Sequence, residues 1–93
     1  MSIEFEWDPE KAATNFEKHG VSFHEAATVF RDPLSVTFPD PNHSVGENRY
    51  IIIGQSIVGL VLIVAHTERG QRLRIITARK ATRKEKTFYE EGF

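Results

Sequence analysis

Three β-branched runs separated by short turn segments place the strongest constraint on the fold of this 93-residue chain. The runs cover residues 49–53, 59–66 and 72–79, and their composition is typical of strands. Residues 54–59 begin and end with glycine and predict a hairpin, and residues 68–71 predict a second tight turn. Strands joined in this way favour a mostly antiparallel sheet.

The chain before these runs has the pattern of a short strand and a helix. Residues 3–7 alternate apolar and acidic side chains, as in a half-buried strand. Asp8 and Pro9 then suit the N-cap and first position of a helix, and Gly20 suits its left-handed end. Spacings of three and four residues predict a buried stripe on this helix that consists of Ala12, Ala13, Phe16 and His19.

A second, short helix is expected directly after the corner at Gly20. Ser22 and Glu25 have the spacing of a capping box, and the helix is predicted to end near Phe30. Residues 34–38 predict another strand, and residues 81–90 predict a closing helix.

The resulting order is β-α-α-β-β-β-β-α. It predicts an α+β fold in one domain over residues 1–93, in which a mostly antiparallel sheet carries two N-terminal helices and one C-terminal helix.

Charge is distributed unevenly along the chain. Residues 1–48 have nine acidic residues against three basic ones, whereas residues 49–93 have nine basic residues against four acidic ones. A basic half is a weak indication of a polyanion site. The longest apolar run is far shorter than the roughly 20 residues that span a bilayer, and no signal peptide is visible. A cytoplasmic protein without a membrane partner is therefore expected.

Several motifs, in order and over nearly the whole chain, resemble those of the BrnT family, the ribonuclease toxins of type II toxin–antitoxin pairs. The motifs are Trp7-Asp8-Pro9-x-Lys11, Asn15-x-x-Lys18-His19-Gly20-Val21-Ser22-Phe23, Gly46-Glu47-x-Arg49, Thr67-Glu68-Arg69 and Arg74-Ile75-Ile76-Thr77-Ala78-Arg79-Lys80-Ala81. The resemblance implies a RelE-like fold and cleavage of RNA that inhibits translation. It also implies neutralisation by a ribbon-helix-helix antitoxin of the BrnA kind. Promoter DNA would then be bound only through the toxin–antitoxin complex.

Metal-independent RNA cleavage needs groups that stabilise the extra negative charge on phosphorus. Arginine suits this role because its guanidinium is always charged and grips phosphate oxygens in pairs. Arg49, Arg74 and Arg79 are the preferred candidates. In an unbroken strand Arg72 and Arg74 would share one face and Arg79 the other, so only a bulge or the strand's end would bring Arg79 to the same cleft.

Proton transfer is the second requirement of the chemistry. His19 is expected at a helix C-terminus, where the macrodipole favours its protonated form, so it suits a general acid or a phosphate clamp. A structural corner histidine is the alternative. Glu47 is a candidate for removing the 2′-OH proton, with an ion pair to an arginine as the equal alternative. The candidate RNA-binding residues are Lys18, Arg69, Arg72, Lys80 and Tyr89.

A cofactor or metal is not expected. The chain has no cysteine, and its four histidines lack the spacing of a zinc site. Two further interpretations remain open beside the ribonuclease. One is a non-catalytic module whose basic half binds nucleic acid or an acidic partner. The other is a degenerate toxin that acts only within a promoter-binding complex.

Overall fold

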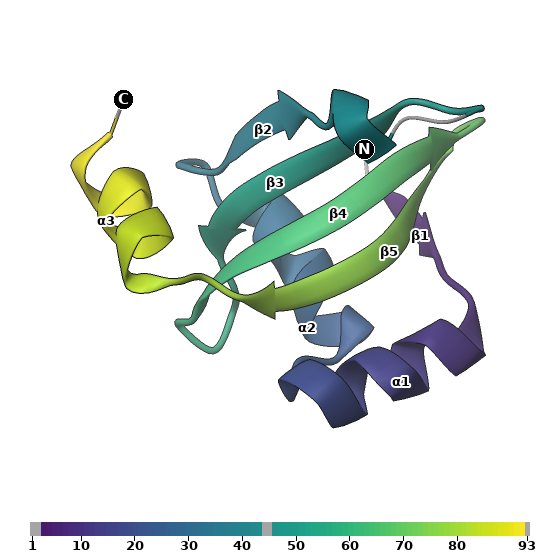
Figure 1. Cartoon of the computed structure of the whole chain (residues 1–93), viewed down its shortest axis with the longest axis horizontal. Coiled ribbons are helices and arrows are strands. Elements are labelled where there is room, and N and C mark those ends of the chain that lie inside the picture. The colour runs from purple at the N-terminus through teal and green to yellow at the C-terminus, as the bar shows by residue number, and fades with distance from the viewer. Residues whose placement is uncertain (1–2, 44–45, 93) are drawn as a thin grey trace.

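The computed structural model describes residues 3–43 and 46–92, and its elements follow the predicted order (Figure 1). The strands are β1 (Glu4–Glu6), β2 (Val36–Pro39), β3 (Arg49–Gln55), β4 (Val61–Arg69) and β5 (Arg72–Lys80). The helices are α1 (Pro9–His19), α2 (Phe23–Thr28) and α3 (Arg83–Glu91), with the short 3₁₀ helices η1 (Val29–Arg31) and η2 (Pro41–His43). The predicted α+β class is confirmed. No helix in these residues is long and apolar enough to cross a bilayer.

The five strands form one sheet in the order β1-β5-β4-β3-β2. The pairs β2–β3, β3–β4 and β4–β5 are antiparallel, and the pair β1–β5 is parallel. The strand predicted over 34–38 begins later, at Val36. The reason is a turn at Asp32, whose carboxylate accepts from the Leu34 N–H at 2.9 Å and whose carbonyl accepts from the Ser35 N–H at 3.1 Å.

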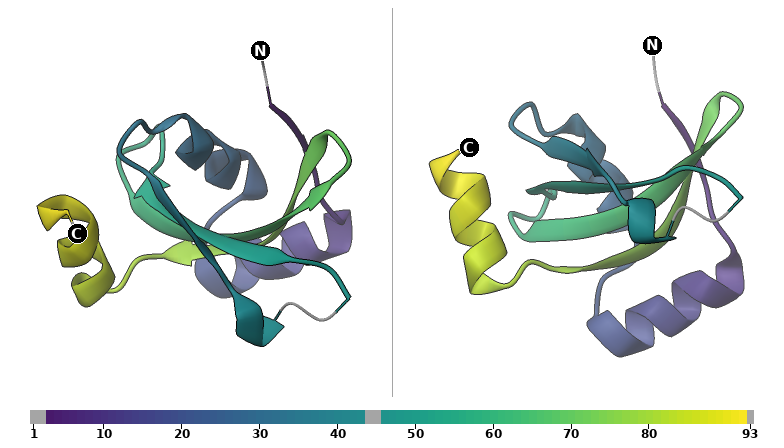
Figure 2. Two further views of the ribbon diagram at one scale, coloured as in Figure 1. Left: turned by 90° about the horizontal axis from the view of Figure 1, so that it is seen from above. Right: turned by 45° about the horizontal axis from the view of Figure 1, so that its top comes forward.

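Helix α2 and η2 lie on opposite sides of the sheet, as Figure 2 shows. The covered face packs against α2 and η1, and its core includes Phe23, Val29, Leu62, Val64 and Ile75. Side chains alternate along a strand, so the opposite, open face carries Arg49, Ile51, Ile63, Ala65 and Thr67. Helix α3 lies at one end of the sheet, where Tyr89 packs against Ile53, Val61 and Ile63.

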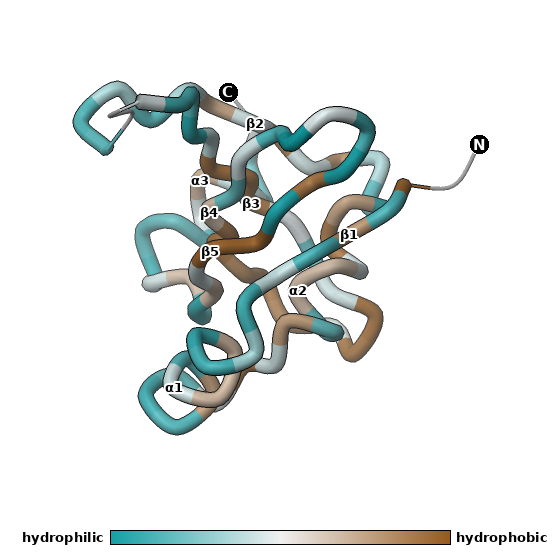
Figure 3. Tube along the Cα trace, turned by 90° about the vertical axis from the view of Figure 1, so that its right-hand side faces the viewer, coloured by the Kyte–Doolittle hydropathy of each residue, from teal (hydrophilic) through white to brown (hydrophobic). Residues whose placement is uncertain are grey.

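The buried side of α1 differs from the predicted stripe. Phe16 is 56% exposed, whereas Asn15, which is not part of that stripe, is only 6% exposed. The Asn15 amide donates to the Val21 carbonyl at 3.1 Å and to the Ala78 carbonyl at 2.8 Å, and it accepts from the Ala78 N–H at 3.1 Å. Strand β1 pairs with β5 only at residues 72–74, so Asn15 satisfies a stretch of strand edge that β1 leaves uncovered. In Figure 3, α1 is mostly hydrophilic beside the hydrophobic middle of β5.

Side-chain N-caps begin α2 and α3. Ser22 accepts from the Glu25 N–H at 3.0 Å, as the predicted capping box requires. The Glu25 carboxylate, however, accepts from the Ser56 hydroxyl at 2.7 Å and ties α2 to the β3–β4 turn. A capping box with both bonds forms instead at the start of α3, between Thr82 and Glu85. Helix α3 therefore begins at Arg83, two residues later than predicted.

Gly54 allows β3 to approach η1 closely. A Cβ atom at this position would lie 2.9 Å from the Ser35 Cβ and 2.9 Å from the Val29 Cγ1. Both neighbours are short, so we expect Gly54→Ala to lower the free energy of unfolding by about 1–3 kcal/mol, measured by urea denaturation. Adding Ser35→Gly removes one obstructing atom and is expected to recover part of the loss. Equal stability of Gly54→Ala and the unchanged protein would contradict this close packing.

Candidate active site

A β-bulge in β5 decides which arginines share a face of the sheet. Ile76 is an extra residue, because Ile75 and Thr77 pair with adjacent residues of β4. One extra residue inverts the alternation of side chains beyond it. Arg74 before the bulge and Arg79 after it therefore both lie on the open face, whereas an unbroken strand would have separated them.

Two adjoining cavities form a groove between α1 and the open face, named here the α1–sheet groove. The larger, of about 550 Å³, is lined on the α1 side by Lys11, Lys18 and His19, with the carboxylates Asp8 and Glu10, and on the sheet side by Arg49 and Thr77, among others. The smaller, of about 230 Å³, lies over β3 to β5 and is lined by Arg49, Thr77, Arg79, Asp40 and His43, among others. Arg49 and Thr77 line both cavities, so they lie where the two meet.

The end of α1 brings Lys18 and His19 to the groove. Gly20 has a φ of +70° and its N–H bonds the Phe16 carbonyl at 2.8 Å, which ends the helix abruptly. Lys18 and His19 occupy the last turn, where the negative end of the macrodipole favours cations. His19 is half-buried, as expected of a side chain directed toward the sheet. The two residues therefore line the larger cavity of the groove together with Arg49.

The Arg79 guanidinium is held by a carboxylate of α3. Its two terminal nitrogens donate to the two Glu85 oxygens at 2.8 and 2.9 Å. This fork lowers the pKa of Glu85 to about 2 and raises the pKa of Arg79. Glu85 thus occupies Arg79 in the way that a phosphate group would.

Stability at acid pH is expected to report the Arg79–Glu85 pair. A carboxyl whose pKa falls from 4.5 to about 2 on folding stabilises the native state above pH 4.5, and this contribution is lost as pH falls toward 2. The unfolding free energy of Glu85→Gln should therefore decline less than that of the unchanged protein between pH 4.5 and pH 2. Solvent screens the half-exposed pair and moderates the difference. The exposed Glu17→Gln is the control, and parallel pH curves for all three proteins would contradict the expectation.

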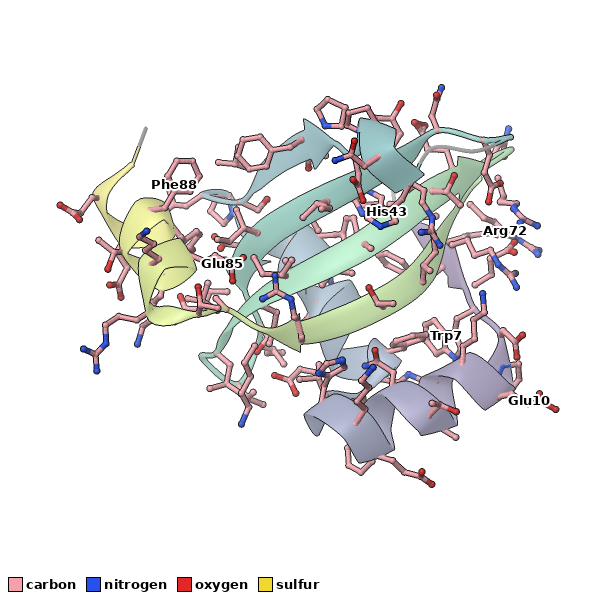
Figure 4. The ribbon with its side chains drawn as sticks, viewed as in Figure 1. Trp7, Glu10, His43, Arg72, Glu85 and Phe88 are labelled. Atoms are coloured by element: carbon pink, nitrogen blue, oxygen red, sulfur yellow. The ribbon has the colours of Figure 1, made fainter. Side chains whose placement is uncertain are left out.

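Three of the expected arginines pair with carboxylates on the open face. They pair as Arg74 with Glu6 at 2.7 Å, Arg72 with Glu4 at 3.2 Å, and Arg69 with Glu47 at 3.3 Å. None of these residues lines the α1–sheet groove. Figure 4 shows Arg72 at the end of the sheet opposite Glu85. The structure therefore brings Arg49, Arg79, Lys18 and His19 to the groove. Glu47 lies outside it, paired with Arg69.

Tyr89 and Lys80 also lie outside the groove. The Tyr89 hydroxyl donates to the Asp32 carboxylate and so fastens α3 to the turn before β2. Burial, followed by this carboxylate, raises the pKa of Tyr89 to about 12. Lys80 is the exposed last residue of β5, and its carbonyl accepts from Arg79 at 3.3 Å. The contacts of Tyr89 are those of a structural residue.

The residues that line the groove and that sequence reasoning did not select include Lys11, Asp40, His43 and Thr77. Lys11 and Thr77 lie within the quoted family motifs, which was a usable signal. Asp40 and His43 lie in a turn-rich segment with no pattern of its own, and only the packing of η2 over the open face reveals them (Figure 4). In residues 3–43 and 46–92, no three histidine or carboxylate side chains are grouped so as to hold a metal ion.

Comparison with known proteins points to one family. A family model described as "Ribonuclease toxin, BrnT, of type II toxin-antitoxin system" matches residues 7–85. The fold is similar to the crystal structure of the Brucella abortus ribonuclease toxin, BrnT, with a TM-score of 0.69 and 24% sequence identity. That match covers 88% of this chain and 100% of the Brucella chain. No curated protein matches the sequence.

Proposed function

The chain belongs to the BrnT family of ribonuclease toxins of type II toxin–antitoxin systems, and we propose that it is a metal-independent endoribonuclease. The observation that carries this proposal is the α1–sheet groove: Lys18 and His19 share its larger cavity with Arg49, and Arg49 shares its smaller cavity with Arg79. Cationic side chains from α1, β3 and β5 around one hollow suit a phosphodiester and its neighbouring phosphates.

The reaction follows from the chemistry of RNA. The ribose 2′-oxygen attacks the adjacent phosphorus while the bond from phosphorus to the 5′-oxygen breaks, which yields a 2′,3′-cyclic phosphate and a 5′-hydroxyl. Arg49 and Arg79 stabilise the charge that develops on the phosphoryl oxygens. His19, at the end of α1, acts as the general acid that donates a proton to the leaving 5′-oxygen, and Lys18 contacts a neighbouring phosphate.

The Arg79 guanidinium is bound to the Glu85 carboxylate in this structure. A substrate phosphate would displace that carboxylate or bind to Arg79 beside it. Arg69, Arg72 and Arg74 give the open face additional positive charge that attracts RNA along its length, each weakened by its own carboxylate partner.

Membership of a type II family implies a protein antitoxin and an RNA target. We propose a ribbon-helix-helix antitoxin whose complex with this chain binds the promoter, and action in the cytoplasm, where translated RNA is found. A short ribbon-helix-helix reading frame next to this gene would support the antitoxin, and its absence would count against it.

The test of the proposed activity uses purified protein and a defined single-stranded RNA in excess EDTA. We expect fragments that end in a 2′,3′-cyclic phosphate, with 5′-hydroxyl partners, identified by mass spectrometry. RNA that is retained on the protein but remains intact would contradict catalysis. That outcome would favour the binding module, which the carboxylate pairing of four arginines also favours.

A further inference from the structure

A histidine–carboxylate pair lies in the α1–sheet groove and has no part in the function proposed so far. The Nδ1 atom of His43 is 3.2 Å and 3.1 Å from the two carboxylate oxygens of Asp40. Both residues line the smaller cavity together with Arg49, Thr77 and Arg79. Figure 4 shows His43 reaching from η2 over the open face of the sheet.

The backbone holds this pair beside Arg49. The Asp40 N–H donates to the Arg49 carbonyl at 2.9 Å, which continues the β2–β3 ladder by one step beyond the pairing of Pro39 with Tyr50. The His43 N–H then donates to the Asp40 carbonyl at 3.2 Å and closes the single turn of η2. The Asp40 side chain is 14% exposed and that of His43 is 64% exposed, so a largely buried carboxylate supports an accessible ring.

The contact to Asp40 determines which ring nitrogen can take a proton. A carboxylate accepts from Nδ1–H, so the neutral ring carries its proton on Nδ1 and its lone pair on Nε2. An imidazole held in this tautomer by a carboxylate is suited to general-base catalysis. The other charged groups that line the cavity, Arg49 and Arg79, are cations that oppose a second positive charge, whereas Asp40 favours the imidazolium formed during the reaction.

We propose that His43 is the general base of the RNA cleavage and that Asp40 is its positioning residue; this inference rests on the proposed function. His43 Nε2 takes the 2′-OH proton as the 2′-oxygen bonds to phosphorus. The bond from phosphorus to the 5′-oxygen breaks, and His19 protonates the departing oxygen. Arg49 and Arg79 hold the phosphoryl charge between them. Glu47, the base candidate from sequence, pairs with Arg69 outside both cavities.

The test compares single-turnover cleavage by the unchanged protein, His43→Ala and Asp40→Asn, with RNA affinity measured separately. We expect His43→Ala to cleave about 100- to 10,000-fold more slowly, with less than a tenfold change in affinity. Asp40→Asn should also cleave more slowly with nearly unchanged affinity, because the ring loses the carboxylate that holds its Nδ1–H. His24→Ala, an exposed histidine on α2 outside the groove, is the control and should cleave normally.

Two measurements separate a base from a structural or acidic role. Free imidazole should restore part of the cleavage by His43→Ala, which a variant that fails to fold would not show. An RNA with a 5′-bridging sulfur has a leaving group that needs no general acid. On that substrate, the defect of His19→Ala should disappear and the defect of His43→Ala should persist.

The failure of this inference is distinguishable from failure of the proposed function. If the unchanged protein cleaves RNA and Arg49→Ala does not, while His43→Ala cleaves within about threefold of the unchanged rate, His43 is not the base. The same conclusion follows if the sulfur-containing RNA rescues His43→Ala, because His43 would then act as the acid. If the unchanged protein leaves RNA intact, the ribonuclease proposal itself fails.

Discussion

Replacing Arg49 with alanine is expected to lower the rate of RNA cleavage about 100- to 1000-fold, the effect of removing one charge-stabilising donor from an active site. Arg49 lies where the two cavities meet, so no other arginine borders both the α1 side and the Arg79 side of the groove. Single-turnover cleavage of a defined RNA measures the loss. Arg49→Lys keeps the charge but loses the paired donors, so it should retain an intermediate rate.

Arg31→Ala is the matched control for Arg49→Ala. Arg31 is an exposed arginine in η1, and it lines neither cavity of the groove. Its removal changes net charge by the same amount and is expected to leave the cleavage rate nearly unchanged. Equal losses in the two variants would indicate that long-range attraction by total charge, and not the groove, accounts for RNA binding.

Replacing Asn15 with alanine is expected to lower the free energy of unfolding by about 2–4 kcal/mol, because buried backbone groups lose their partners. The amide of Asn15 satisfies both backbone groups of Ala78 and the carbonyl of Val21. Asn15→Asp should be more harmful, since a carboxylate cannot donate to two carbonyls and would be buried. Urea denaturation measures both effects.

Phe16→Ala on the same helix is the control for Asn15→Ala. Phe16 is the larger and more apolar residue, but its side chain is mostly exposed, so its loss should change stability by only about 0.5 kcal/mol. A larger loss for Phe16→Ala than for Asn15→Ala would restore the stripe predicted from sequence. Asn15→Ala is also expected to slow RNA cleavage, because Asn15 holds the Lys18 and His19 end of α1 against β5.

Local signals in the sequence were sufficient for the order of elements. The β-branched runs at 49–53, 59–66 and 72–79 became β3, β4 and β5, because short glycine-containing links leave consecutive strands little choice but to pair. The helix between Asp8 and Gly20 was predicted with its observed ends, since both caps depend on residues within one turn. Motif resemblance added the family, which the family model confirms.

The composition of the site depended on tertiary structure. The bulge at Ile76 moves Arg79 to the face of Arg74. A bulge is defined by the register between β5 and β4, so the sequence of β5 alone does not indicate which residue is the extra one. Asn15 is buried because β1 leaves the outer edge of β5 uncovered at Ala78. The Asp40–His43 pair lies beside Arg49 because Asp40 extends the β2–β3 ladder by one step and η2 follows it. Periodicity and capping act within a few residues, so sequence alone determined the elements. Register and edge pairing join residues far apart in the chain, so only the folded sheet decided which side chains share the groove.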